Sequence, residues 1–389
     1  MPKHTKVSRL ANVPGIGVDR MGNAADAVHD PELLRLENLD TDIPPPKIAL
    51  EITRQGIGKD ENNSYLPFLG QDELRKAAAK RVSRVSGIPY DWRTQCIISA
   101  GAMSGILNCL LAMLEPGDEV IITDPVYAGI INRIRLAGGV TVFVPLIPSP
   151  AGWRLDITAL EQAVSPRTKM LLISPGMPTG HVLTQAEWEA VARVCIKTDA
   201  WLLYDAAVER ILYDGRSVIH PASLPHMQER TITVGSAAKE LRMIGWRIGW
   251  IVGPESLMND IGLVSISNTV CQIGISMAGV AAGLNAADDG LKAAIKVWEE
   301  RRNTLLQELD GLPVIPPHGG WSLLLDAEAL GMTSQEASER LFKEAKIAAT
   351  PMSGWGENAA KYLRFVFSNE PKERLLGMGK KVKRALGIF

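Results

Sequence analysis

A lysine, an arginine and a serine lie close together in the segment Ser236–Trp250, and their side chains can act together on a phosphorylated aldehyde. The segment begins at the end of one short apolar run and continues into the next, and open α/β sheets bind ligands at strand carboxyl ends. The amine of Lys239 can form a Schiff base with an aldehyde there. Arg247, eight positions later, offers a planar fork for a phosphate dianion, and Ser236 can add a hydroxyl donor to the same phosphate.

A carboxylate and a small-residue turn are further candidates for this chemistry. Asp205 ends an apolar run 34 residues before the lysine, and a buried charge in that position needs a partner. The segment Ser99–Gly105 lies between an apolar run and a helical pattern, so free backbone amides and the helix dipole point where an anion would bind. Close packing also selects glycine, and the turn alone is therefore weak evidence.

The pattern Ser-x-x-Lys followed by Gly-Trp-Arg-x-Gly resembles the cofactor-lysine motif of class I/II aminotransferases, which are pyridoxal-phosphate (PLP) enzymes of fold type I. The resemblance implies that Lys239 carries PLP as a Schiff base and, once released, transfers the proton at the substrate α-carbon. It implies that Arg247 and Ser236 hold the phosphate, and that Asp205 pairs with the protonated pyridine nitrogen. The turn resembles the family's phosphate loop, whose amides would come from Gly101, Ala102 and Met103.

Four other positions resemble family segments. Tyr127, in Asp-Pro-Val-Tyr, would stack its ring on the pyridine, and Tyr65 would reach the phosphate of the neighbouring subunit, which implies a homodimer with shared active sites. Arg364 would clamp the substrate α-carboxylate in bidentate fashion. Asn38 falls where the family usually has a small residue whose backbone also touches that carboxylate.

The sequence departs from the family at two positions that usually serve the phenolic oxygen of PLP. Met177 replaces the second asparagine of an Asn-Pro-x-Asn-Pro-Thr-Gly loop, and its thioether cannot donate a hydrogen bond. Val208 replaces the tyrosine of a Glu-x-Tyr segment. We hypothesise that losing both donors raises the pKa of the Schiff base, unless Tyr204 or another residue takes over.

These departures leave more than one reaction open. The favoured function is transfer of an amino group between an α-amino acid and a 2-oxo acid (EC 2.6.1.-). The alternative is elimination, lyase or oxidative chemistry by a related PLP enzyme, because altered cofactor electronics could suit another fate of the substrate carbanion. A regulator on the same scaffold is disfavoured, since the chain shows no basic winged-helix module and keeps the lysine. The amino donor and acceptor stay open.

Helical patterns alternate with short apolar runs from about residue 70, which is typical of a parallel sheet flanked by helices. The fold expected is α/β, with a large domain built on a seven-stranded, mostly parallel sheet and a smaller α+β domain. The seven runs are Gln95–Ala100, Glu119–Thr123, Val140–Ile147, Lys169–Ser174, Trp201–Asp205, Thr231–Gly235 and Arg247–Val252. Most are continuously apolar, as strands covered on both faces should be.

Three parts of the chain follow from this pattern. Residues 46–285 are expected to form the large PLP-binding domain, and residues 286–389 the small C-terminal domain. Residues 1–45 hold prolines and little periodicity, so we expect them to contribute to the small domain and to dimer contacts.

Charge and composition exclude several other classes. Lys and Arg number 42 against 43 Asp and Glu, which leaves no positive field to hold nucleic acid. The four cysteines show no metal-ligand spacing, the histidines have no partner motif, and no metal is expected. No apolar run approaches the ~18 residues of a membrane span, so a cytoplasmic protein without a membrane partner is expected.

Overall fold

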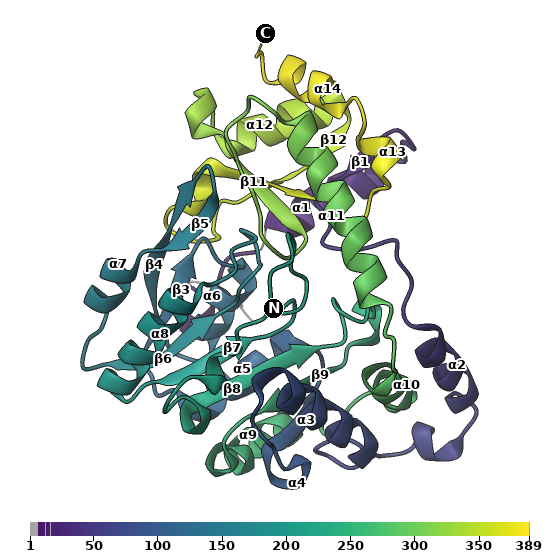
Figure 1. The fold of residues 1–389 in the computed structure, drawn as a ribbon, viewed down its shortest axis with the longest axis vertical. Helices are drawn as coiled ribbons and strands as arrows, with labels where there is room; N and C mark the ends of the chain where they lie inside the picture. Colours follow the sequence, from purple (N-terminus) through teal and green to yellow (C-terminus); the bar gives the residue numbers. More distant parts are fainter. Residues whose placement is uncertain (1–6, 12, 16, 389) are drawn as a thin grey trace, which may run out of the picture.

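An eight-stranded sheet forms the centre of the larger of two bodies, in the strand order β2-β9-β8-β7-β6-β3-β4-β5 (Figure 1). This computed structural model describes residues 7–11, 13–15 and 17–388. The strands are β2 (Cys96–Ser99), β3 (Glu119–Asp124), β4 (Val140–Ser149), β5 (Gly152–Leu155), β6 (Thr168–Ile173), β7 (Trp201–Asp205), β8 (Thr231–Ser236) and β9 (Gly249–Val252). The five strands from β8 to β4 run parallel, whereas β9 is antiparallel to both of its neighbours and β5 is antiparallel to β4.

The sheet differs from the sequence expectation in two places. It has one strand more than the seven predicted, because the four residues of β5 fold back on β4 as a hairpin edge, with Leu146 opposite Leu155. A run of four residues is too short to show a clear period. The last predicted strand starts later than expected, at Gly249, because Arg247 follows a 3₁₀ turn and adopts a left-handed conformation, with φ 55°.

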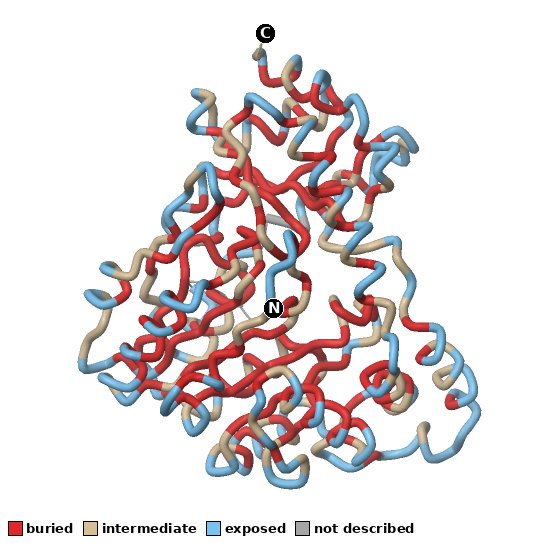
Figure 2. Tube along the Cα trace, viewed as in Figure 1, coloured by how far each residue is buried: buried red, intermediate tan, exposed pale blue. Residues whose placement is uncertain are grey.

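Both faces of the sheet are covered because successive side chains of a strand point to opposite faces. Leu172 and Leu203 pack in one cluster with α5 (Ala102–Met113), α6 (Ala128–Leu136) and α9 (Glu255–Thr269). Leu171 and Leu202 pack on the other face with α7 (Ile157–Gln162) and α8 (Gln185–Thr198). Further along that face lie α3 (Asp72–Ser86) and α10 (Gly274–Asn285), which contacts α2 (Lys47–Gly56). Figure 2 shows the buried strands between exposed outer helix faces.

The smaller body is an antiparallel sheet covered by helices, drawn at the top of Figure 1. Its strand order is β10-β11-β14-β13, and a separate parallel pair joins β1 (Leu34–Arg35) to β12 (Ile347–Ala348). The sheet strands are β10 (Val314–Ile315), β11 (Ser322–Asp326), β13 (Thr350–Pro351) and β14 (Tyr362–Val366). The helices around it are α1 (Gly17–Val28), α11 (Leu291–Glu308), α12 (Ser334–Arg340), α13 (Lys372–Leu375) and α14 (Met378–Ala385). The pairing of β1 brings part of the N-terminal segment into this body.

The two bodies are joined by the turn between α10 and α11. Helix α10 ends at Asn285, because Ala286 leaves the helical conformation with ψ 138°, and Gly290 precedes α11 with φ 72°, a left-handed conformation that suits glycine. Position 286, where we expect the small domain to begin, directly follows α10, and α11 packs its Trp298 in the core of the smaller body.

Membrane spans, metal sites and disulfide bonds were considered from the sequence. None of the helices in the described part of the chain combines the length and apolar character of a membrane span. Residues 7–11, 13–15 and 17–388 contain no group of three or more potential metal ligands. All cysteines are free, and Cys96, Cys109 and Cys195 are buried.

Candidate active site

A cavity of about 250 Å³ opens between the two bodies, at the carboxyl ends of β7 and β8. Parallel strands present their carboxyl ends at one edge of the sheet, so residues far apart in the sequence meet there. The predicted site residues that line it are Asn38, Ala102, Met103, Tyr127, Met177, Asp205, Ser236, Lys239, Arg247 and Arg364. Gly101 lies directly behind this lining, whereas Tyr65 does not line the cavity.

Lys239 lines the cavity and lies in the loop that follows β8. Its Nζ donates a hydrogen bond of 2.8 Å to the carbonyl of Leu39 and lies 4.8 Å from the ring centroid of Trp321. Burial lowers the pKa of Lys239 to about 7, and Asp40 opposes that shift. An amine with such a pKa is largely unprotonated just above neutral pH, as a Schiff-base nucleophile must be.

Asp205 ends β7 and brings a buried carboxylate to the cavity. Its Oδ2 accepts from the Ser174 hydroxyl at 2.9 Å, and its Oδ1 accepts from the Ala207 amide at 3.1 Å. Burial raises the pKa of Asp205, while those hydrogen bonds and the positive charge of Lys239 oppose the shift. No cation within the described residues forms an ion pair with Asp205. The carboxylate is therefore suited to a ligand that brings a protonated nitrogen.

The opposite end of the cavity can hold an anion. Gly101 precedes α5 with φ 82°, and no side chain caps that helix, so its first amides are free for a ligand. A Cβ at Gly101 would lie 2.7 Å from Nη2 of Arg247, so this guanidinium lies close to the turn, and the positive φ at this position favours glycine. Arg247 Nη1 donates to the carbonyl of Ile244 at 2.6 Å, and the Ser236 hydroxyl also reaches the cavity. Phosphate-sized anions suit this arrangement.

Arg364, on β14, presents a second buried cation. Its Nη2 donates to the carbonyl of Glu37 at 2.6 Å, and its guanidinium carbon lies 4.8 Å from the ring centroid of Trp355. Burial lowers the pKa of Arg364 to about 10, which still leaves it charged at neutral pH. No carboxylate in the described part of the chain pairs with it, so a carboxylate ligand can. Tyr127 stands beside Trp355 in an edge-to-face contact, with ring centroids 5.4 Å apart.

The two residues that depart from the family pattern differ in their position relative to the cavity. Met177 lines the cavity, whereas Val208 packs in the core outside it and is 3% exposed. The structure does not place Tyr204 to replace their hydrogen bonds, because its hydroxyl donates to Glu209 at 3.3 Å in a buried position away from the lining. The side of the cavity around Met177, its apolar flank, also includes Leu39 and Ile244.

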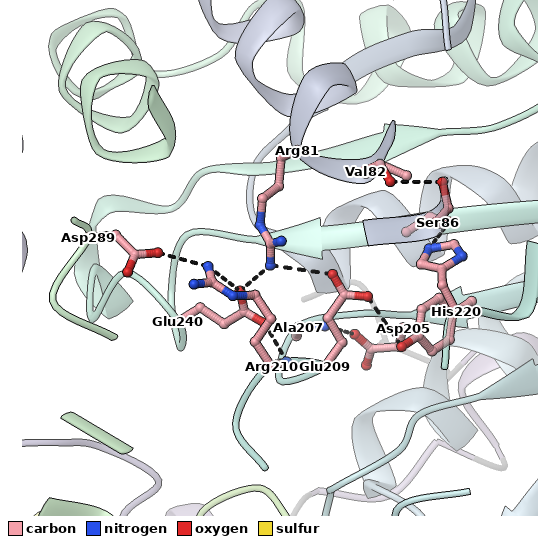
Figure 3. Close-up of polar contacts among 12 residues, drawn as sticks. Arg81, Val82, Ser86, Asp205, Ala207, Glu209, Arg210, His220, Glu240 and Asp289 are labelled. Atoms are coloured by element: carbon pink, nitrogen blue, oxygen red, sulfur yellow. Dashed lines mark hydrogen bonds and ion pairs between the residues drawn. The ribbon is translucent and has the colours of Figure 1, made fainter. Parts of the chain in front are cut away.

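A buried ion network joins α3 to the segments that follow β7 and β8, which contain Glu209 and Glu240 (Figure 3). Arg81, on α3, donates to Glu240 at 2.6 Å and to Glu209 at 3.4 Å. Glu240 also accepts from the Arg210 amide at 2.9 Å, and burial with the nearby charge of Glu240 raises the pKa of Glu209. A larger hollow of about 820 Å³ adjoins this network but contains neither Lys239 nor Asp205, so we assign the chemistry to the smaller cavity.

The family comparison agrees with this geometry. A family model described as aminotransferase class I and II matches residues 36–376. The chain belongs to this family. The aminotransferases of classes I and II use PLP and act on an amino acid and a 2-oxo acid, so this protein is an aminotransferase (EC 2.6.1.-).

Individual aminotransferases resemble the chain over most of its length. Aromatic-amino-acid aminotransferase 2 of Thermococcus litoralis is 31% identical over 334 residues, which cover 85% of each chain. Arginine–pyruvate transaminase AruH of Pseudomonas aeruginosa is 31% identical over 345 residues, covering 87% of this chain and 86% of that one. The structure of aspartate aminotransferase from Thermus thermophilus with maleate superposes with a TM-score of 0.89 at 27% identity, covering 98% and 100%. The substrates in the names of the three proteins differ.

The cavity of this aminotransferase has groups for each part of PLP. The buried carboxylate of Asp205, which has no cation partner in the described residues, fits the ring nitrogen. The open N-terminus of α5 beside Arg247 fits the phosphate. The amine of Lys239, with its lowered pKa, fits the aldehyde. Sequence reasoning missed Trp321 and Trp355, which approach Lys239 and Arg364 from the smaller body. It also missed the hydroxyl of Ser174, although that residue begins the loop that contains Met177.

Proposed function

We propose that this aminotransferase carries PLP on Lys239 and releases a 2-oxo acid from an α-amino acid whose carboxylate is bound by Arg364. The observation that supports this most is charge: Asp205 and Arg364 reach one cavity beside Lys239, and neither has an ion-pair partner within the described residues. Buried charges of this kind are costly unless a ligand neutralises them.

Each side chain has a distinct part in the proposal. Asp205 keeps a proton on the ring nitrogen, and PLP then supplies an electron sink for the bond that breaks at the α-carbon. Arg247, Ser236 and the first amides of α5 hold the phosphate. Arg364 would orient the substrate by its carboxylate, and the free amine of Lys239 would accept the proton from the substrate α-carbon and hold it for return. The apolar flank around Met177 helps to exclude water.

We propose the domain limits and the assembly on related grounds. The large domain would span residues 46–285, the small domain residues 286–389, and residues 1–45 would serve the small domain and the dimer. Apolar side chains are exposed on α2, on the following segment and around the start of α10, which are Ile48, Ile57, Tyr65, Phe68, Val270, Ile273 and Ile275. Tyr65 is 82% exposed, as a residue would be that completes the site of a second copy.

A single-turnover experiment tests the reaction. Holoenzyme is mixed with each of a panel of amino acids without any 2-oxo acid acceptor. We expect one equivalent of 2-oxo acid per site and loss of the visible cofactor absorbance. Continuous release of ammonia with unchanged absorbance would instead show elimination or oxidation and would overturn the proposed transamination.

Mixing two defective variants tests the shared site. Lys239→Ala subunits lack the amine, and Tyr65→Ala subunits lack the side chain offered to the partner. A mixed dimer then has one site with both residues intact, so activity should rise above that of either variant alone. Tyr65→Phe is the matched control for the ring without the hydroxyl. Sedimentation as a monomer, or no gain on mixing, would contradict the shared site.

A further inference from the structure

Trp321 is the aromatic residue that lies against the amine of Lys239. Its ring centroid is 4.8 Å from Nζ, within the range of a cation–π contact, and no other ring in the described part of the chain approaches this amine so closely. The ring is fully buried, which excludes water from that side of the amine. A protonated amine would therefore face the negative potential of an indole in a site of low dielectric constant.

The surroundings of Trp321 hold its ring in one place. Trp298 contacts it edge to face, with centroids 5.0 Å apart, and the indole N–H of Trp298 donates to Thr41 Oγ1 at 3.1 Å. The Trp321 carbonyl accepts from the Phe367 amide at 3.0 Å. A ring fixed by packing and backbone bonds can position a flexible lysine side chain, whereas a mobile ring could not.

The chain just before Trp321 packs on the flank that lacks the two usual donors. A Cβ at Gly320 would lie 2.0 Å from the carbonyl oxygen of Gly176, the residue before Met177. A Cβ at Gly176 would in turn lie 2.8 Å from Cγ2 of Val208. The segment that precedes the indole therefore packs against the loop that contains Met177, and Gly176 of that loop packs against Val208.

The charged groups around Lys239 act on its protonated form in opposite directions. Arg247 and Arg364 disfavour its protonated form, while Asp40 and Asp205 favour it. Leu39 offers one carbonyl acceptor at 2.8 Å. An indole face stabilises a cation without carrying a charge, so it does not compete with Asp205 for the cofactor nitrogen.

We propose that Trp321 is a positioning residue for Lys239, whose ring face holds the protonated lysine nitrogen in the cavity and stabilises the protonated state of the bound cofactor. This inference rests on the proposed function, since it requires PLP on Lys239. The cation–π contact acts in the same direction as the loss of the two donors at Met177 and Val208, because each raises the pKa of the Schiff base. A desolvated contact of this kind corresponds to a shift of about one pKa unit.

The test is a pH titration of the visible absorbance of holoenzyme variants, with Trp321→Leu against wild type. We expect the apparent pKa of the chromophore to fall by about one unit in Trp321→Leu, because the protonated state loses its aromatic face. Trp321→Phe keeps a ring of weaker cation affinity, so the fall should be about half a unit. Trp153→Leu is the matched control, because Trp153 is 3% exposed and contacts Tyr362 away from the cavity.

The outcomes separate this inference from the proposed function. A pKa unchanged in Trp321→Phe and in any folded Trp321→Leu would show that Trp321 only fills the core and would overturn the inference. A shift equal to that of Trp153→Leu would overturn it too, since loss of any buried indole would then suffice. Wild-type protein without a visible cofactor band, or with the band retained in Lys239→Ala, would instead refute the placement of PLP on Lys239.

Discussion

The two flanks of the cavity around Lys239 are built in opposite ways. On the sheet side, Asp205, Ser236 and Arg247 are polar groups in fixed positions at or near strand ends. On the other side, Met177 and Leu39 present apolar surface from loops. The sheet flank carries the groups that we propose for the charged parts of the cofactor. The side chains of Met177 and Leu39, on the loop flank, have no hydrogen-bond donor.

The largest expected effect tests whether the sheet flank needs its amine. Lys239→Ala should lower kcat by about 10,000-fold, because it removes the group that transfers the proton at the α-carbon. Steady-state release of 2-oxo acid measures the loss. Lys239→Arg, which keeps a positive charge but is not a nucleophile, should be equally inactive. Activity above one-tenth of wild type in either variant would contradict the role of Lys239 in proton transfer.

Disturbing the buried ion network behind the sheet flank should lower the free energy of unfolding. Arg81→Met leaves Glu209 and Glu240 buried without their cation, and we expect a loss of about 3–5 kcal/mol in the free energy of unfolding. Urea denaturation of the holoenzyme measures it. Arg84→Met, on the same helix but exposed, is the control and should change stability little. Equal denaturation midpoints for the two variants would mean that the network does not support this flank.

Removing the carboxylate clamp should affect binding of the substrate more than of the cofactor. Arg364→Leu deletes the buried guanidinium, and we expect KM for the amino acid to rise by about 30–100-fold, which corresponds to about 2–3 kcal/mol. The visible cofactor band should persist. Arg364→Lys keeps the charge without the planar fork and should recover only part of the affinity. An unchanged KM would place the substrate carboxylate elsewhere.

The pH dependence of cofactor uptake tests the environment of the lysine. Since burial lowers the pKa of Lys239 to about 7, its amine is protonated below that pH and neutral above it. The rate at which apoenzyme recovers visible absorbance with PLP should therefore rise about tenfold per pH unit below 7 and level off above it. A rate that keeps rising to pH 10 would indicate an ordinary, hydrated lysine.

The smallest predicted effect would make the two flanks more alike. Met177→Asn returns a hydrogen-bond donor to the apolar flank, and one such bond should lower the apparent pKa of the visible chromophore by about one unit. Absorbance titration of the holoenzyme measures it. Met177→Leu has no donor and should leave the pKa unchanged. Equal titration curves for the two variants would mean that position 177 does not reach the cofactor oxygen.

Sequence patterns predicted the sheet flank better than the loop flank. The strand carrying Asp205 and the turn at Gly101 were found because apolar periodicity and glycine chemistry act within a few residues. The contact of Trp321 with Lys239 joins residues 82 positions apart, and no local pattern predicts it. The same holds for Arg81 and Glu240, whose pairing depends on how α3 packs on the sheet. The left-handed backbone of Arg247 was not predicted, because the residue types of a motif do not show its backbone conformation.

The residues around Lys239 come from both bodies, and we propose different roles for them in cofactor attachment and in the choice of amino acid. The groups proposed to hold the ring nitrogen, phosphate and aldehyde of the cofactor lie within residues 46–285, whereas Leu39, Trp321 and Arg364 come from the chain on either side of that range. Changes in the outer segments could therefore alter the accepted amino acid while leaving cofactor attachment intact. An engineer seeking a new substrate would begin with those segments and keep the sheet as an unchanged module.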